Sequence, residues 1–180
     1  MSGSPSIVVL VGNPRPGSRT RLFADAAGVE LSWLLGWPDD SVQTVDLAVL
    51  QGEIFTRPHP RVDEALDAVR SADLLIVATP VYKASYTGLL KGFLDLFGSG
   101  ALDGVVAVPV TVAASPIHRL AAEAHLRPLL VELGASTPTS ALTVEEDRLP
   151  DTPAVLTDWL GTQGRIIRSL LLTRAEEPVP

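Results

Sequence analysis

The sequence predicts an α/β fold in which helices cover both faces of a doubly wound, five-stranded parallel sheet. Short apolar runs rich in β-branched residues alternate along the chain with longer segments whose apolar residues have helical spacing. The runs are apolar throughout, which is typical of parallel strands that are buried on both faces. Five such strand and helix units with right-handed crossovers suit the strand order 2-1-3-4-5.

Length and composition indicate one globular domain. The 180 residues are 46% hydrophobic and 19% charged, a balance that excludes a disordered chain. We expect residues 7–174 to form the domain, with a disordered tail at 1–6 and a second tail at 175–180. The net charge of −7 argues against nucleic acid as a partner. Apolar runs stay below the roughly 18 residues that a membrane span needs, so no membrane partner is expected.

Cysteine is absent, which excludes disulfides and thiolate metal sites, and no metal site is predicted. The first six residues are polar and lead straight into an apolar run. We therefore expect no signal peptide and, by default, a cytoplasmic location.

The first strand is predicted at Ile7 to Val11, an apolar run too short for a buried helix. A turn rich in glycine and proline follows at residues 12–17. Ser18 stands at the N-cap position of an amphipathic helix, which is predicted from about Arg19 to Leu35. A glycine and a proline just beyond Leu35 end this helix.

The turn after this strand has the residues of an anion site. Backbone N–H groups and the dipole of the following helix point into such a loop. Side chains add hydroxyls, an amide and guanidinium groups, a mixture that suits a terminal phosphate monoester. They belong to Asn13, Arg15, Ser18, Arg19 and Thr20. The loop matches neither the dinucleotide nor the Walker pattern, and an ordinary capped turn would use the same residue types.

Asp46 and His59, two polar residues before the third strand, are expected to have structural and not ligand-binding roles. A second strand is predicted at Val42 to Leu47, where Asp46 is expected to cap a turn rather than bind a ribose. His59 lies between two prolines without an acidic partner at ligand spacing, so we expect a solvent-exposed loop residue. The second helix is predicted from Arg61 to Arg70.

The third strand, predicted at Ala72 to Thr79, leads into a loop that suits a flat heteroaromatic ring. Pro80 stiffens the backbone and Tyr82 offers an aromatic edge or face. Backbone N–H groups around Val81 to Lys83 are expected to reach ring oxygens and nitrogens. The alternative is that Tyr82 and Tyr86 only pack the loop against a neighbouring segment. An amphipathic helix follows this loop.

The fourth strand is predicted at Val105 to Val112, although Pro109 cannot donate a hydrogen bond to a ladder. We therefore expect an irregularity at Pro109 or a strand that ends near Val108. Small residues follow, whose side chains would let a ligand approach the backbone: Ala113, Ala114, Ser115 and Pro116. A helix is predicted from about His118 to Leu133, and Pro128 should kink it or open a bonding defect.

A fifth strand at Thr139 to Val144 and a final helix from about Pro153 to Arg174 complete the predicted domain. The apolar face of this helix is wide enough to cover the sheet or to pair with a second subunit. The loops after strands one, three and four should meet at the topological switch point, where doubly wound folds bind ligands. A phosphate loop beside a ring-binding loop fits flavin mononucleotide (FMN) better than a dinucleotide.

Two motifs resemble those of the NAD(P)H-dependent FMN reductase family, whose fold is flavodoxin-like. The first is G-N-P-R-P-G-S-R-T at residues 12–20, similar to the family's phosphate signature G-S-x-R-x-x-S-x-T. The second is T-P-V-Y-K-A-S-Y-T-G-L-L-K-G-F-L-D at residues 79–95, similar to its isoalloxazine loop and following helix. The match is closest to FMN reductases that serve two-component alkanesulfonate-type monooxygenases.

The resemblance implies roles for particular residues. The phosphate would be held by Asn13, Arg15, Ser18 and Thr20, and the flavin ring by Pro80, Val81, Tyr82 and Lys83. Ala113 to Ser115, with His118, would take the place of the family's G-G-S-x-x-H segment, with alanines instead of its glycines. The subgroup carries an extra residue, often tyrosine, that makes a π-helix turn at the subunit interface. Ala124 falls at that position here, with His125 beside it, so either His125 takes over the role or the helix has no such feature and His125 is a packing residue.

The resemblance also implies an enzyme that transfers a hydride from NADPH or NADH to N5 of FMN. Reduced flavin would pass to a partner flavin-dependent monooxygenase, and the chain would form a homodimer or homotetramer. The transfer needs no acid, base or nucleophile, so no catalytic side chain is predicted, although Lys83 could stabilise negative charge on the reduced ring. Two alternatives stay open: an FMN-retaining reductase of quinones, azo dyes or metal oxyanions, and a flavodoxin-type electron carrier without NAD(P)H activity.

Overall fold

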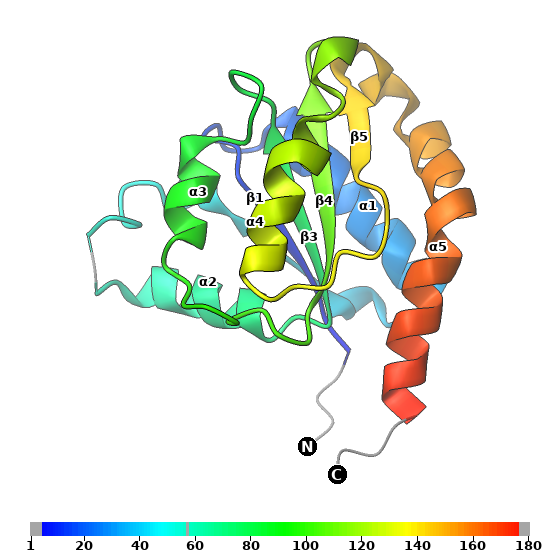
Figure 1. Cartoon of the computed structure of the whole chain (residues 1–180), viewed down its shortest axis with the longest axis horizontal. Coiled ribbons are helices and arrows are strands. Elements are labelled where there is room, and N and C mark those ends of the chain that lie inside the picture. The colour runs from blue at the N-terminus through cyan, green and yellow to red at the C-terminus, as the bar shows by residue number, and fades with distance from the viewer. Residues whose placement is uncertain (1–4, 57, 177–180) are drawn as a thin grey trace.

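The computed structural model describes residues 5–56 and 58–176 and contains a five-stranded parallel sheet in the order β2-β1-β3-β4-β5 (Figure 1). The strands are β1 (Ile7–Val11), β2 (Val42–Asp46), β3 (Leu74–Pro80), β4 (Val106–Ala113) and β5 (Leu142–Glu145). The predicted fold class and strand order are therefore confirmed. The predicted terminal tails fall mostly outside the described residues.

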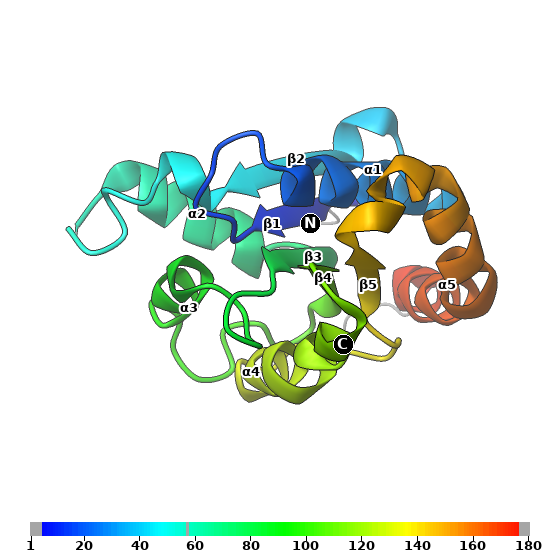
Figure 2. The ribbon, with the colours of Figure 1, turned by 90° about the horizontal axis from the view of Figure 1, so that it is seen from above.

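Helices cover both faces of the sheet (Figure 2). They are α1 (Arg19–Leu35), α2 (Pro60–Arg70), α3 (Gly88–Leu94), α4 (Arg127–Glu132) and α5 (Thr152–Glu176). Shorter segments are 3₁₀ turns at Asp39–Ser41, Leu47–Val49, Pro116–His118 and Glu146–Asp151, and a π-helix at Ala122–Leu126. One apolar cluster joins α1 and α5 to the sheet, and a second joins α2, α3 and α4 to its other face. No helix in the described ranges is long and apolar enough to cross a membrane.

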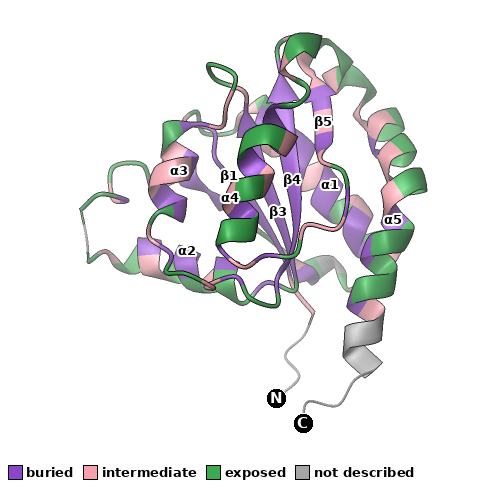
Figure 3. Ribbon diagram, in the orientation of Figure 1, coloured by how far each residue is buried: buried purple, intermediate pink, exposed green. Residues whose placement is uncertain are grey.

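The three central strands carry the core. Every residue of β1, β3 and β4 is buried (Figure 3), as their continuous apolar runs predict. The parallel register places the carboxyl ends of these strands at one edge of the sheet, with Val11 beside Ala78 and Pro80 beside Val112. The loops that follow them must therefore start close together.

Pro109 does not interrupt β4, so the expected irregularity or early end near Val108 is wrong. Pro109 lies in register with Val77 of β3, and the strand continues beyond it. The N–H of Val106 donates toward β3 and that of Ala107 toward the opposite side. Because the N–H directions alternate along a strand, the backbone nitrogen of Pro109 faces away from β3. Pairing with β5 begins only at Val110, so no ladder bond is lost at the proline.

The segment predicted as one helix from His118 is divided. A π-helix at Ala122–Leu126 precedes α4, and the N–H of Arg127 donates to the carbonyl of Ala122, five residues back. Pro128 has no N–H with which to continue the α-helical pattern. The bonding defect predicted at Pro128 is confirmed, whereas the predicted helical start at His118 is wrong.

Glu123 ties this π-helix to the segment that enters β5. Its carboxylate accepts hydrogen bonds from the guanidinium of Arg127, one of them at 3.0 Å, and from the backbone N–H of Ala141 at 2.7 Å. Arg127 also donates to the carbonyls of Thr137 and Thr139, both at 2.6 Å. The hydrogen bond from Arg127 holds the pKa of Glu123 below its ordinary value.

This pKa shift predicts a pH-dependent contribution to stability. A carboxyl whose folded-state pKa is lowered stabilises the fold above its unfolded pKa, and the effect is lost as pH falls through the folded pKa. Glu123→Gln should therefore lower the free energy of unfolding by about 1 kcal/mol at pH 7 and by less near pH 3.5. Urea denaturation at the two pH values measures the difference. Glu132→Gln, an exposed change on the following helix, is the control, and an equal loss for Glu123→Gln at both pH values would contradict the prediction.

Candidate functional site

The loops after β1 and β3 meet in a cavity of about 310 Å³ at the carboxyl edge of the sheet. This loop cavity is lined by Asn13, Arg15, Pro16, Gly17, Ser18, Arg19, Thr20, Pro80, Tyr82, Val112 and Glu146. A second, more open hollow of about 580 Å³ is lined by Val81, Tyr82, Lys83 and His118. Tyr82 lines both, so we treat the loop cavity and this outer hollow as one candidate site.

Asn13 shapes the first loop from within. Its side chain is buried, its Oδ1 accepts the N–H of Arg15 at 2.9 Å, and its Nδ2 donates to Oγ1 of Thr20 at 3.1 Å. Thr20 thus accepts from Asn13 and keeps its own hydroxyl proton for another acceptor. Gly17, with φ of +61°, makes the left-handed turn that aims the chain into α1. Ser18 caps that helix by accepting the N–H of Arg21 at 3.2 Å.

The two arginines of this loop differ in their partners. Arg15 is exposed, and its guanidinium has no ion-pair partner within the described part of the chain. Arg19 forms an ion pair with Glu146, with Nη2 2.8 Å from Oε2. Glu146 follows β5 and lies 127 positions from Arg19 in sequence, so no local pattern could have placed it here.

Buried threonines lock the first loop to the second. The hydroxyl of Thr87 donates to the carbonyl of Gly12 and accepts the N–H of Leu90 at 3.1 Å. The N–H of Thr87 in turn donates to Oγ1 of Thr79 at 3.2 Å. Neither threonine was predicted as part of the site. Their role becomes visible only when the ends of β1 and β3 are placed side by side.

The second loop is a tight hairpin. Tyr82 and Ser85 exchange backbone hydrogen bonds at 2.8 and 3.1 Å, and the two residues between them, Lys83 and Ala84, have φ of +52° and +65°. A left-handed conformation costs a residue other than glycine about 1–2 kcal/mol. This stored strain is typical of a loop held in place for binding.

The hairpin uses two of the three backbone N–H groups that were expected to reach a ring. That of Val81 donates to the carbonyl of Val112 at 3.0 Å, and that of Tyr82 is used within the turn. Among the described residues, the N–H groups of Lys83 and Ala84, at the tip of the hairpin, have no backbone acceptor. Tyr82 is 43% exposed and lines both hollows, whereas the partly buried Tyr86 packs against the core.

Of the residues predicted in the third loop, His118 alone lines one of the two hollows. Ala113 is fully buried at the end of β4, and Ala113, Ala114 and Ser115 are absent from the lining of both hollows. Val112, one residue earlier, lines the loop cavity instead. His118 does line the outer hollow, and its buried Nδ1 has no hydrogen-bond partner among the described residues.

Two residues outside the site can now be placed. Asp46 accepts the N–H of Ala48 at 3.1 Å, which confirms its role as a turn cap. His59 is partly buried, with Nδ1 3.1 Å from a carboxylate oxygen of Glu53, so the predicted free, exposed histidine is wrong. The described residues contain no group of side chains that could hold a metal ion.

Comparison with known proteins identifies the family. The model of the NADPH-dependent FMN reductase family matches residues 5–148. The chain belongs to this family. The resemblance of the two loop motifs is thereby confirmed, because the matched region contains both of them.

Several relatives of this FMN reductase family member cover most of its length. An FMN reductase (NADPH) of Escherichia coli K12 is 34% identical over 133 residues, which are 72% of this chain and 67% of that protein. The NADH-dependent FMN reductase SfnF of Pseudomonas fluorescens is 36% identical over 153 residues, 82% of this chain and 80% of that protein. A solved apo structure of an NADH:FMN oxidoreductase, EMOB, has 32% identity and a TM-score of 0.71, covering 87% of this chain and 88% of that one.

The residues of the site fit the flavin that the family name specifies. A terminal phosphate needs several short donors and a cation, which the loop cavity supplies through Ser18, Thr20 and Arg15, an arginine with no ion-pair partner among the described residues. A flat ring needs an aromatic surface and N–H donors, which the exposed Tyr82 and the tip of the hairpin supply. In a member of the FMN reductase family, these residues are the candidates for FMN contact.

Proposed function

We propose that this chain is an NAD(P)H-dependent FMN reductase that holds the FMN phosphate in the loop cavity and the ring against the Tyr82–Ser85 hairpin. One observation carries the proposal: a single cavity is lined both by the first loop, with Arg15, and by Pro80 and Tyr82 of the second. A site with a phosphate half and a ring half matches the chemistry of FMN. The buried threonines hold the two halves at a fixed separation.

The protein's part in the reaction is orientation. Bound FMN supplies the hydride acceptor, so no acid, base or nucleophile is required from the chain. Asn13 holds the loop, Arg15, Ser18 and Thr20 bind the phosphate, and the hairpin N–H groups bind the ring edge. The ammonium of Lys83, at the exposed tip, would favour negative charge on the reduced ring. His118 would form part of the wall of the outer hollow, and Ala113 to Ser115 would form the segment between β4 and His118.

We also propose that reduced flavin passes to a partner monooxygenase and that the chain acts as a homodimer or homotetramer. Ala124 and His125 lie exposed in the π-helix, and nearby Ile117 and Leu120 are 83% and 72% exposed. Such an apolar surface suits contact with a second copy. We further propose that the reaction takes place in the cytoplasm.

A flavin-free preparation should oxidise NADPH or NADH only when FMN is added. The purified protein should be colourless, because FMN acts as a substrate that binds and dissociates in each turnover. The visible spectrum and nicotinamide oxidation at 340 nm, with and without FMN, measure this. A tightly bound yellow flavin would favour a reductase of quinones, azo dyes or metal oxyanions. No nicotinamide oxidation under any condition would leave only an electron carrier.

A further inference from the structure

An ion pair closes one wall of the loop cavity. Arg19 is the first residue of α1, and Glu146 is the first residue of the 3₁₀ segment after β5. Both line the cavity, and their side chains approach to 2.8 Å. The pair therefore places a carboxylate at the rim of the hollow assigned to a phosphate.

The pair changes the charge of this hollow. Arg15 and Arg19 together would offer two positive charges, but Glu146 neutralises one of them. A phosphate monoester carries about −1.5 to −2 charges near neutral pH, so it is attracted by Arg15 and the helix dipole and repelled by Glu146. The cavity thus contains less positive charge than its arginines imply.

We propose that Glu146 limits the affinity of this site for the flavin phosphate and so allows the flavin to leave. This inference rests on the proposed function, because it assumes that the phosphate of FMN lies in the loop cavity. It assigns a specificity-determining role to a residue outside both loop motifs. Release of the flavin is what an enzyme needs when FMN is its substrate.

The ion pair between Arg19 and Glu146 should contribute little to the stability of the fold. The side chains of Arg19 and Glu146 are 62% and 42% exposed, and exposed ion pairs contribute about 0.2–1 kcal/mol to stability. Removing the carboxylate should therefore leave the fold intact. Its repulsion of a nearby phosphate would be lost at the same time.

The test is Glu146→Gln, which keeps the side-chain shape and still accepts a hydrogen bond from Arg19. Titrations followed by flavin fluorescence give the Kd of FMN and of riboflavin, which lacks the phosphate. The Kd of FMN should fall about three- to tenfold at low salt, and half-molar salt should reduce that gain. The Kd of riboflavin should stay within about twofold, because it carries no charge there.

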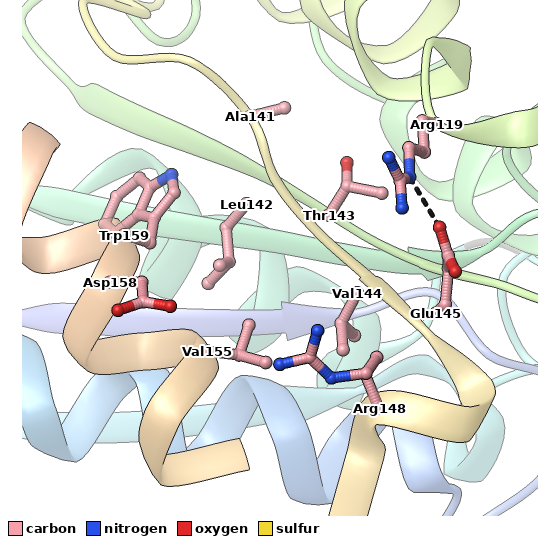
Figure 4. Close-up of a pocket in the computed structure, with 10 residues that line it drawn as sticks. All are labelled: Arg119, Ala141, Leu142, Thr143, Val144, Glu145, Arg148, Val155, Asp158 and Trp159. Atoms are coloured by element: carbon pink, nitrogen blue, oxygen red, sulfur yellow. Dashed lines mark hydrogen bonds and ion pairs between the residues drawn. The ribbon is translucent and has the colours of Figure 1, made fainter. Parts of the chain in front are cut away.

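Glu145→Gln is the matched control. Glu145 precedes Glu146 but faces Arg119, with Oε1 2.5 Å from Nε, in a separate hollow of about 400 Å³ beside β5 (Figure 4). This hollow shares no lining residue with the loop cavity. The control removes the same charge one position away and should leave both flavin affinities unchanged.

A double-mutant cycle gives a second readout. Arg19→Gln should weaken FMN binding more in the Glu146→Gln background than in the wild type, because only there is the positive charge of Arg19 not neutralised by a carboxylate. An equal cost in both backgrounds would contradict the proposal.

The outcomes separate the two claims. If wild-type protein binds FMN no more tightly than riboflavin, the proposed phosphate site is wrong and this inference fails with it. If the wild type prefers FMN but Glu146→Gln leaves that preference unchanged or weakens it, only the role of Glu146 is overturned. Tighter FMN binding by Glu146→Gln, with Glu145→Gln unchanged, supports it.

Discussion

Arg15→Ala should weaken FMN binding about ten- to hundredfold and change riboflavin binding little, since a hydrogen-bonded charge contributes about 1.5–3 kcal/mol. Arg15 is the loop arginine without a partner in the described ranges, so its full charge is available to a ligand. Its backbone N–H already bonds to Asn13, and alanine keeps that bond. The loop should therefore keep its shape while the cavity loses its free cation. Fluorescence titration with each flavin measures the two Kd values.

The control for this change is Arg165→Ala, which removes an exposed arginine from α5. It alters the net charge of the protein by the same amount as Arg15→Ala. A difference between the two variants therefore reports the position of the lost charge and not the change in net charge. Equal losses of FMN and riboflavin affinity in Arg15→Ala would show that the loop does not hold a phosphate. That result would remove the main support for the phosphate half of the site.

The fold could be predicted because its signals are local and agree with one another. Continuous apolar runs, helical spacing and capping residues such as Ser18 each depend on a few neighbouring residues. The prediction that Pro109 would disturb β4 was wrong because a missing N–H weakens a strand only where a neighbouring strand would accept its hydrogen bond. That depends on where β5 begins to pair, which local sequence does not show.

The site could be predicted in outline and not in its contacts. Motif spacing located both loops, since each loop is a contiguous segment. It missed Glu146 and the bond from Thr87 to Gly12, because these join segments far apart in sequence. It also could not show that the N–H groups of Val81 and Tyr82 are used within the protein, which leaves that of Lys83 among the three predicted. The left-handed turn at Lys83 contains no glycine that would indicate it, so the sequence did not predict the hairpin.

The junction between the two loops predicts a second large effect, at Gly12. A Cβ added there would lie 2.6 Å from Cβ of Leu90, well inside contact distance. Leu90 is fully buried, and its Cβ is fixed to the backbone of α3, so it cannot move aside. Gly12→Ala should therefore push α3 from the end of β1 and lower the free energy of unfolding by about 1–3 kcal/mol.

Flavin binding should also be weakened in the same variant, because the carbonyl of Gly12 is the acceptor that joins the first loop to Thr87. Unlike Arg15→Ala, this change should weaken FMN and riboflavin alike, since it separates the two halves of the site. Gly161→Ala in α5, where an added Cβ meets nothing within 4 Å, should instead raise stability by about 0.5–1 kcal/mol. Thermal unfolding and the two flavin titrations measure both changes. A Gly12→Ala protein as stable as the wild type, with normal flavin affinity, would show that the close approach of β1 and α3 does not set the spacing of the loops.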